Sequence, residues 1–216
     1  MAHKAICFDL DGTLLDTLAD IGGCMNTTLE QFGFPVHSLE RYKIFVGDGM
    51  ENLARRALPE GQHTDARVTE CVAGMRNQYG KRWKETTRPY EGVTEMLDAL
   101  TARGIKLTVL SNKPDDFSKV IVKEFFGDWK FEAVFGARLN VPKKPDPAGA
   151  FEIAALLELP PEDFLYMGDT NTDMWTAKAA GMYALGALWG FRPAQEMQDA
   201  GAMALLAHPR EVINYI

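Results

Sequence analysis

The stretch Lys4-Ala-Ile-Cys-Phe-Asp-Leu-Asp-Gly-Thr13 joins a short apolar run to two carboxylates and a glycine. Residues 4–8 are typical of a buried parallel strand, and the polar residues behind them are typical of a loop at its carboxyl end. An apolar run followed by polar residues returns at 105–112, 133–136 and 164–169. We therefore expect parallel strands that deliver polar side chains to one edge of a sheet.

Segments of helical character separate these predicted strands. Residues 93–100 end before Gly104, residues 147–157 follow Asp146, and residues 172–180 end at Gly181. Glycine behind a helix and proline at its first position are the usual helix boundaries. The alternation of strand and helix predicts an α/β fold, a doubly wound parallel sheet with right-handed crossovers. Its ligand crevice would lie beyond the carboxyl ends of the strands.

Residues 13–89 interrupt this alternation. Apolar residues recur at helical spacing within 18–32, 50–58 and 68–83. We expect an inserted helical cap over residues 15–88 and an α/β catalytic core made of residues 1–14 and 89–216. The connections at 14–17 and 86–90 would then act as a hinge.

Composition narrows the classes of partner. The chain has 216 residues, 46% of them hydrophobic, and 23 basic against 30 acidic residues give a net charge of −7. No basic run could follow a phosphate backbone, so we expect no nucleic acid partner. No segment approaches the roughly 20 apolar residues of a membrane helix, so we expect a protein that is neither secreted nor membrane-spanning. Monomer and homodimer both stay open.

The three cysteines, Cys7, Cys24 and Cys71, are scattered and form no metal-ligand or CxxC pattern. Buried thiols in a reducing compartment are the simpler interpretation. We therefore expect a cytoplasmic protein.

Asp9 and Asp11 lie two residues apart, so they leave the first strand on the same side of the chain. Two adjacent carboxylates repel each other unless they share a proton or a cation, and a hard divalent metal, magnesium first, is the simplest remedy. Gly12 allows a sharp turn, and the hydroxyl and amides around Thr13 can meet an anion. The alternative is an Asp-rich turn in which Asp11 or Thr13 caps a helix.

Asp169 and Asp173 follow another predicted strand, in Gly168-Asp-Thr-Asn-Thr-Asp173. Asp169 would bring a third carboxylate beside the first two. Asp173 opens the next helix and is equally consistent with a helix cap and with a functional group.

Ser111, Asn112 and Lys144 add neutral donors and a positive charge. Ser111 and Asn112 end a predicted strand with a hydroxyl and an amide that suit phosphate oxygens, although both residues are also common in turns and caps. Lys144 lies in a proline-rich loop that could direct its ammonium into the crevice, or it is a solvated lysine.

In order and spacing, these segments resemble the motifs of the haloacid dehalogenase superfamily of phosphatases. The matching residues are Asp9 to Thr13, Ser111, Lys144 and Gly168 to Asp173. The resemblance covers essentially the whole chain, and residues 45–49, 53–57 and 189–193 are similar to the phosphoglycolate phosphatase subgroup. One departure is Glu91, where the family often has proline.

This resemblance implies a magnesium-dependent phosphatase acting on a small phosphorylated metabolite. Asp9 would attack phosphorus and form an aspartyl-phosphate, and Asp11 would act first as general acid and then as general base. Lys144, which the family register selects over Lys143, would neutralise charge. Ser111, Asn112 and the segment at Thr13 would hold the phosphoryl oxygens.

The resemblance also implies a set of magnesium ligands. They are a carboxylate oxygen of Asp9, the backbone carbonyl of Asp11 and the carboxylate of Asp169. Asp173 would orient a metal-bound water or Lys144. In the predicted cap, Arg55 could meet a substrate carboxylate or lie in solvent.

Rival functions differ in the role that they give to Asp11. A metal-free dehalogenase and a phosphonate-cleaving relative would leave Asp11 without a role, whereas a phosphosugar mutase on the same core stays open. A phospho-accepting signalling module fits less well, because its accepting aspartate follows a separate strand while Asp9 and Asp11 share one turn. A complete set of motif residues argues against an inactive binding protein. The sequence favours 2-phosphoglycolate as substrate without fixing it.

Overall fold

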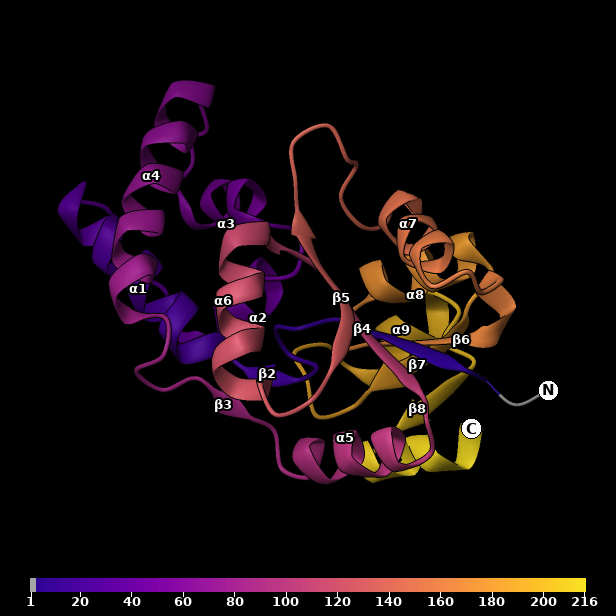
Figure 1. Ribbon diagram of the computed structural model, residues 1–216. Helices are drawn as coiled ribbons and strands as arrows, with labels where there is room; N and C mark the ends of the chain where they lie inside the picture. The colour runs from indigo at the N-terminus through magenta and orange to yellow at the C-terminus, as the bar shows by residue number, and fades with distance from the viewer. Residues whose placement is uncertain (1–2) are drawn as a thin grey trace. The chain divides into compact units, whose positions relative to one another are not determined.

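The computed structural model describes residues 3–216, and the chain divides into two compact units (Figure 1). The first unit combines the chain up to Leu15 with residues Pro89–Ile216, and the second is Asp16–Arg88. Each unit has its own elements and is described separately. Their roles as catalytic core and cap stay a prediction.

The first unit is built on a parallel sheet. In the described part of the chain its six strands have the order β5-β4-β1-β6-β7-β8, and every pair of neighbours is parallel. The strands are β1 (Ala5–Phe8), β4 (Lys106–Pro114), β5 (Phe131–Ala137), β6 (Phe164–Gly168), β7 (Tyr183–Ala187) and β8 (Ala204–Leu206). The predicted doubly wound α/β fold is confirmed, because the chain moves outward from β1 in one direction and then, after β5, in the other.

Helices cover both faces of this sheet. They are α5 (Val93–Ala102), α6 (Asp115–Phe126), α7 (Ala148–Leu156), α8 (Asn171–Ala180) and α9 (Ala194–Asp199), with 3-10 turns η1 (Pro161–Asp163) and η2 (Pro209–Tyr215). In Figure 1, α7 and α8 lie together on one side of the sheet, and α5 lies with η2 on the other. All four residues of β1 are fully buried, as a central strand covered on both faces requires.

Strand β4 is longer than the sequence indicated. We predicted that Ser111 and Asn112 end this strand, but it continues through them to Pro114. Pairing with β5 resumes at Pro114 and Ala137 after a shift in register. The backbone therefore stays in the sheet although its side chains turn polar.

The second unit is helical, as the apolar spacing predicted. It contains α1 (Leu18–Gln31), α2 (Leu39–Phe45), α3 (Met50–Ala57) and α4 (Asp65–Arg82). Helices α1 and α4 form its main contact, where the Sγ atom of Cys71 lies 3.7 Å from the Sδ atom of Met25. All three cysteines of the chain are buried and free of disulfides. Helix α2 was not predicted, because its seven residues carry only two buried side chains.

None of the helices within residues 3–216 combines the length and the apolar character that crossing a membrane requires.

The chain enters and leaves the second unit through two short strands, β2 (Leu15–Asp16) and β3 (Arg88–Pro89), which pair with each other. Close behind them, the buried carboxylate of Asp20 joins the two ends of the unit. It accepts hydrogen bonds from the backbone N–H of Thr86 at 3.0 Å and of Thr87 at 2.9 Å, and from both hydroxyls at 2.6 and 2.8 Å. Asp20 thus holds the segment at Thr86 and Thr87, where the chain leaves the second unit, against the start of α1.

We expect Asp20→Asn to lower the free energy of unfolding by about 1–3 kcal/mol at about pH 7, because the NH2 group that replaces one carboxylate oxygen cannot accept hydrogen bonds and the negative charge is lost. Burial pushes the pKa of the Asp20 carboxyl upward, but the bonds from Thr86 and Thr87 outweigh it, so the pKa lies below its ordinary value. The carboxylate therefore stabilises the fold above the unfolded pKa of about 3.9, and this stabilisation is lost as pH falls through the folded value.

Urea denaturation at about pH 7 and at about pH 3 measures this effect. The difference between wild type and Asp20→Asn should narrow at the lower pH. Asp16→Asn is the matched control, since its ion pair with Arg88 is long, at 3.7 Å, and more exposed. A difference of the same size at both pH values would contradict the role given to the Asp20 charge.

Candidate active site

Three buried carboxylates meet at the carboxyl edge of the sheet. Asp9 follows β1, Asp169 follows β6, and Asp173 lies in the first turn of α8. Strands β1 and β6 are neighbours, and Phe8, the last residue of β1, is paired with Met167 of β6. One oxygen of each carboxylate lies within 4.8 Å of the others. We call Asp9, Asp169 and Asp173 the acidic cluster.

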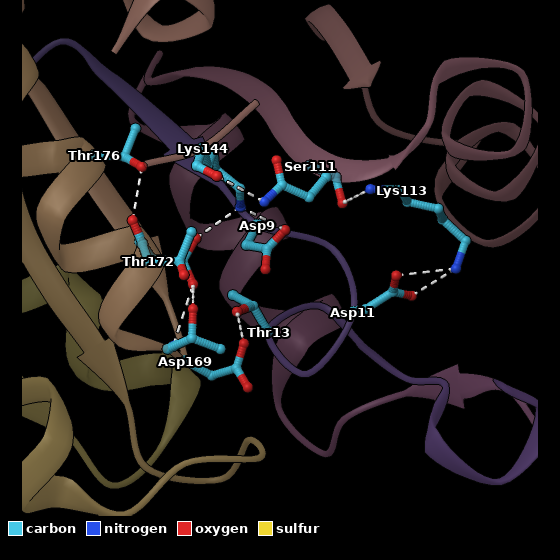
Figure 2. Close-up of polar contacts among 12 residues, drawn as sticks. Asp9, Asp11, Thr13, Ser111, Lys113, Lys144, Asp169, Thr172 and Thr176 are labelled. Atoms are coloured by element: carbon cyan, nitrogen blue, oxygen red, sulfur yellow. Dashed lines mark hydrogen bonds and ion pairs between the residues drawn. The ribbon is translucent and has the colours of Figure 1, made fainter. Parts of the chain in front are cut away.

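Lys144 brings a buried positive charge to the acidic cluster (Figure 2). Its Nζ lies 2.9 Å from Oδ1 of Asp9 and 2.7 Å from Oδ1 of Asp173, and its side chain is only 2% exposed. Burial alone would lower the pKa of Lys144, but the carboxylates of Asp173 and Asp9 outweigh it and hold that pKa well above its ordinary value. The neighbouring Lys143 is exposed, so the structure places at the cluster the lysine that the family register selected.

The acidic cluster has more negative charge than Lys144 can balance. Three ionised carboxylates and one ammonium leave a formal charge of −2. Burial raises the pKa of Asp9 to about 7, with a further contribution from Asp173 against the opposing effect of Lys144. Burial, Asp173 and Asp9 raise the pKa of Asp169 well above its ordinary value. A divalent cation with oxygen ligands fits this donor set, because it would balance the charge and favour the ionised carboxylates.

Asp173 caps α8 and also contacts Lys144. Its Oδ2 accepts hydrogen bonds from the N–H of Thr170 at 3.1 Å and from the Thr170 hydroxyl at 2.7 Å, which caps α8. Its Oδ1 accepts from Lys144. A Cβ atom on Gly168 would lie 2.2 Å from Cγ of Asp173, so glycine is needed there for this approach.

Asp169 is enclosed by two glycines and held by two hydrogen bonds. Its Oδ1 accepts from the Thr13 hydroxyl at 3.1 Å and its Oδ2 from the N–H of Phe191 at 2.8 Å. A Cβ atom on Gly12 would lie 2.3 Å from Oδ2, and one on Gly190 would lie 2.2 Å from Cβ of Asp169. The hydroxyl of Thr13 therefore contacts the acidic cluster, and its predicted contact with substrate stays a prediction.

The segment Trp189–Phe191 is a part of the site to which sequence reasoning gave no role. Besides the bond from Phe191, the indole N–H of Trp189 donates to the backbone carbonyl of Thr13 at 2.9 Å. The segment thus connects the loop after β7 to the loop after β1. A glycine between two aromatic residues just behind a strand was the available signal.

Ser111 and Asn112 are buried side chains of β4, the other neighbour of β1. The Ser111 Oγ accepts from the N–H of Lys113 at 3.2 Å. The amide of Asn112 donates to the backbone carbonyl of Lys144 at 3.0 Å, so Asn112 holds the loop that carries this lysine. Phosphoryl binding by Ser111 and Asn112 stays a prediction.

Lys113 is a charged residue of the site that the sequence analysis missed. Its Nζ lies 2.9 Å from each carboxylate oxygen of Asp11, and the two side chains are 4% and 12% exposed. Figure 2 shows the Asp11 carboxylate turned toward Lys113 and away from Asp9. The available signal was its position two residues after Ser111, where a regular strand would put both side chains on one face.

In the second unit, Arg55 forms contacts with residues of the same unit. Its guanidinium forms an exposed ion pair with Asp65 at 2.6 Å. The next residue, Arg56, donates to the carbonyl of Phe45 at 3.0 Å and pairs with Asp48. A role for Arg55 toward a substrate carboxylate stays a prediction.

Known proteins resemble this chain over most of its length. The family model of the haloacid dehalogenase-like hydrolases matches residues 6–187. A phosphoglycolate phosphatase of Pseudomonas syringae pv. syringae is 30% identical over 214 residues, which are 97% of this chain and 78% of the relative. One of Nitrosospira multiformis is 30% identical over 206 residues, 94% and 91% of the two chains.

Solved structures agree with the sequence relatives. The crystal structure of a predicted phosphoglycolate phosphatase from Haemophilus somnus 129pt is 26% identical and has a TM-score of 0.91. The match covers 98% of this chain and 97% of that chain. The similarity therefore extends over both units.

We expect Gly190→Ala to weaken divalent metal binding by about 10- to 100-fold, because the added methyl group would displace Asp169. Electron paramagnetic resonance of Mn²⁺, a stand-in for Mg²⁺, measures free and bound ion directly. Gly23→Ala is the matched control, since its Cβ would have its nearest neighbour at 3.9 Å. Wild-type Mn²⁺ affinity in a folded Gly190→Ala protein would contradict the role of this glycine.

Proposed function

The chain belongs to the haloacid dehalogenase-like hydrolases, and we propose that it hydrolyses a small phosphate monoester with Mg²⁺, through an aspartyl-phosphate on Asp9. The observation that supports this proposal most is the buried acidic cluster in contact with Lys144. A carboxylate nucleophile, a fixed cation and oxygen ligands for a metal are what phosphoryl transfer through an acyl phosphate requires.

A phosphate monoester resists hydrolysis because its negative charge repels a nucleophile and its alkoxide leaves poorly. In the proposed reaction, a carboxylate oxygen of Asp9 attacks phosphorus while the Lys144 ammonium offsets charge on the phosphoryl oxygens. The Ser111 hydroxyl orients the phosphoryl group. Mg²⁺, held by Asp9, Asp169 and the Asp11 carbonyl, would supply further neutralisation when bound.

Asp11 is the proposed general acid and base. As an acid it gives a proton to the leaving oxygen, and as a carboxylate it then takes a proton from the water that cleaves the aspartyl-phosphate. Its ion pair with Lys113 holds the carboxylate near the site but turned away from Asp9. The reaction therefore needs a rotation of the Asp11 side chain.

We propose 2-phosphoglycolate as the substrate and residues 15–88 as the cap that selects it, in a cytoplasmic enzyme. The support is the similarity to relatives named phosphoglycolate phosphatase over 94% or more of this chain. A small dianionic ester with an adjacent carboxylate also suits a site with two buried lysines, Lys113 and Lys144.

We expect Lys144→Met to reduce turnover of 4-nitrophenyl phosphate by about 100-fold or more, because a buried charge near the phosphoryl group is lost. Lys143→Met, the matched control, should change turnover less than about threefold, since Lys143 is exposed. Asp9→Asn should form no acid-stable phosphoenzyme and show no turnover. Equal losses in the two lysine variants, or activity in Asp9→Asn, would contradict these assignments.

A substrate panel tests the reaction and its metal. With Mg²⁺ present, we expect the highest kcat/KM for 2-phosphoglycolate over hexose phosphates and nucleotides, with one phosphate released per glycolate formed. Removal of divalent metal by EDTA should stop the reaction and added Mg²⁺ should restore it. Isomerisation of a phosphosugar without release of phosphate would identify a mutase instead.

A further inference from the structure

The ion pair between Lys113 and Asp11 restrains the residue that the proposed reaction must move. Both carboxylate oxygens of Asp11 lie 2.9 Å from the same ammonium. An oxygen of Asp11 can serve the leaving group only after this paired arrangement opens. Hydrogen bonds between two charged groups are the strong ones in proteins, so opening requires a compensating interaction.

The burial of Lys113 increases the need for an interaction that compensates for the loss of Asp11. The side chain of Lys113 is 4% exposed, and a buried ammonium is costly where it loses a carboxylate partner. A second carboxylate that replaced Asp11 would keep the charge of the ion pair unchanged. A neutral group in place of Asp11 would leave the ammonium of Lys113 without a negative partner.

We propose, on the basis of the proposed function, that a carboxylate of the substrate displaces Asp11 from Lys113 and thereby releases Asp11 to the leaving oxygen. Lys113 then has two effects. It holds the acid turned away when no substrate is bound, and it selects esters that carry an anionic group close to the phosphate.

The position of Lys113 suits a short substrate. Ser111 and Lys113 are two residues apart in β4, and the backbone N–H of Lys113 donates to the Ser111 Oγ at 3.2 Å. Ser111 is the proposed phosphoryl contact, so the proposed contacts for the phosphoryl group and the carboxylate are two residues apart in one strand. A ligand that spans the two needs a phosphoryl group and a carboxylate separated by few atoms.

The arginine that the sequence offered for a substrate carboxylate is engaged elsewhere. Arg55 pairs with Asp65 at 2.6 Å, and its side chain is 43% exposed. An exposed ion pair discriminates little between charged and neutral ligands. Buried Lys113 therefore has the stronger case for this role.

The test compares 2-phosphoglycolate with its neutral amide, 2-phosphoglycolamide, in steady-state kinetics with Mg²⁺. We expect wild type to prefer the acid in kcat/KM by about 10- to 100-fold, the value of a charge-assisted contact. Lys113→Met should remove this preference, mainly by lowering kcat/KM for the acid. Lys113→Arg should restore part of it. Lys119→Met, which removes an exposed lysine paired with Asp115, should leave it unchanged.

A binding measurement separates this proposal from the proposed function. In Asp9→Asn, which should not turn over, calorimetry with Mg²⁺ should show tighter binding of the acid than of the amide. The difference should vanish in Asp9→Asn/Lys113→Met. An acid preference that survives the loss of Lys113, or equal losses for acid and amide, would overturn the proposal. Failure of wild type to hydrolyse any monoester would instead overturn the proposed function, while the binding comparison still tests Lys113.

Discussion

The buried ion pairs of Lys144 with Asp9 and Asp173 are the interaction on which the site depends. Asp9 follows the central strand of a sheet covered on both faces, so the residue is only 6% exposed. Burial raises the pKa of Asp9 to about 7, because an ionised carboxylate is costly away from water. Removal of one partner from such a pair leaves an uncompensated buried charge.

Strand order explains why residues far apart in sequence reach this point. Strands β4, β1 and β6 are neighbours. Ser111 lies within β4, and Asp9 and Asp169 directly follow β1 and β6. The strands that follow β1 in the chain, β4 and β5, lie on one side of it, and the later strands β6, β7 and β8 lie on the other. A doubly wound sheet leaves a crevice between crossovers at such a point. Close approach in this crevice needs small residues. Gly12 and Gly190 leave room for Asp169, and Gly168 leaves room for Asp173.

The sequence predicted the elements whose pattern is local. β1 and β6 are apolar runs that end at aspartates, and the helices 93–100, 147–157 and 172–180 were found close to their observed bounds. The extension of β4 was missed because a polar side chain gives no sign that its backbone still pairs with a neighbouring strand.

The partners of the charged side chains were less accessible to sequence reasoning. Lys113 and Asp11 are 102 residues apart, and which of several lysines meets which aspartate is decided by strand register and loop path. Motif spacing selected Lys144, but it gave no role to Trp189–Phe191, whose contacts with Thr13 and Asp169 include backbone groups. A backbone N–H or carbonyl carries no residue-specific signal, so the partners in these contacts are visible only in the fold.

The two lysines explain how two adjacent aspartates can do different chemistry. Asp9 and Asp11 leave the same strand, yet Asp9 faces Lys144 within the acidic cluster and Asp11 faces Lys113 outside it. A nucleophile must stay fixed and ionised, and Lys144 together with a divalent cation would favour that state. A general acid and base must change both its protonation and its position, and a partner that a substrate carboxylate can replace permits this. In the proposed reaction, surroundings and not residue type therefore divide the work between the two carboxylates, as in other enzymes with paired acidic groups.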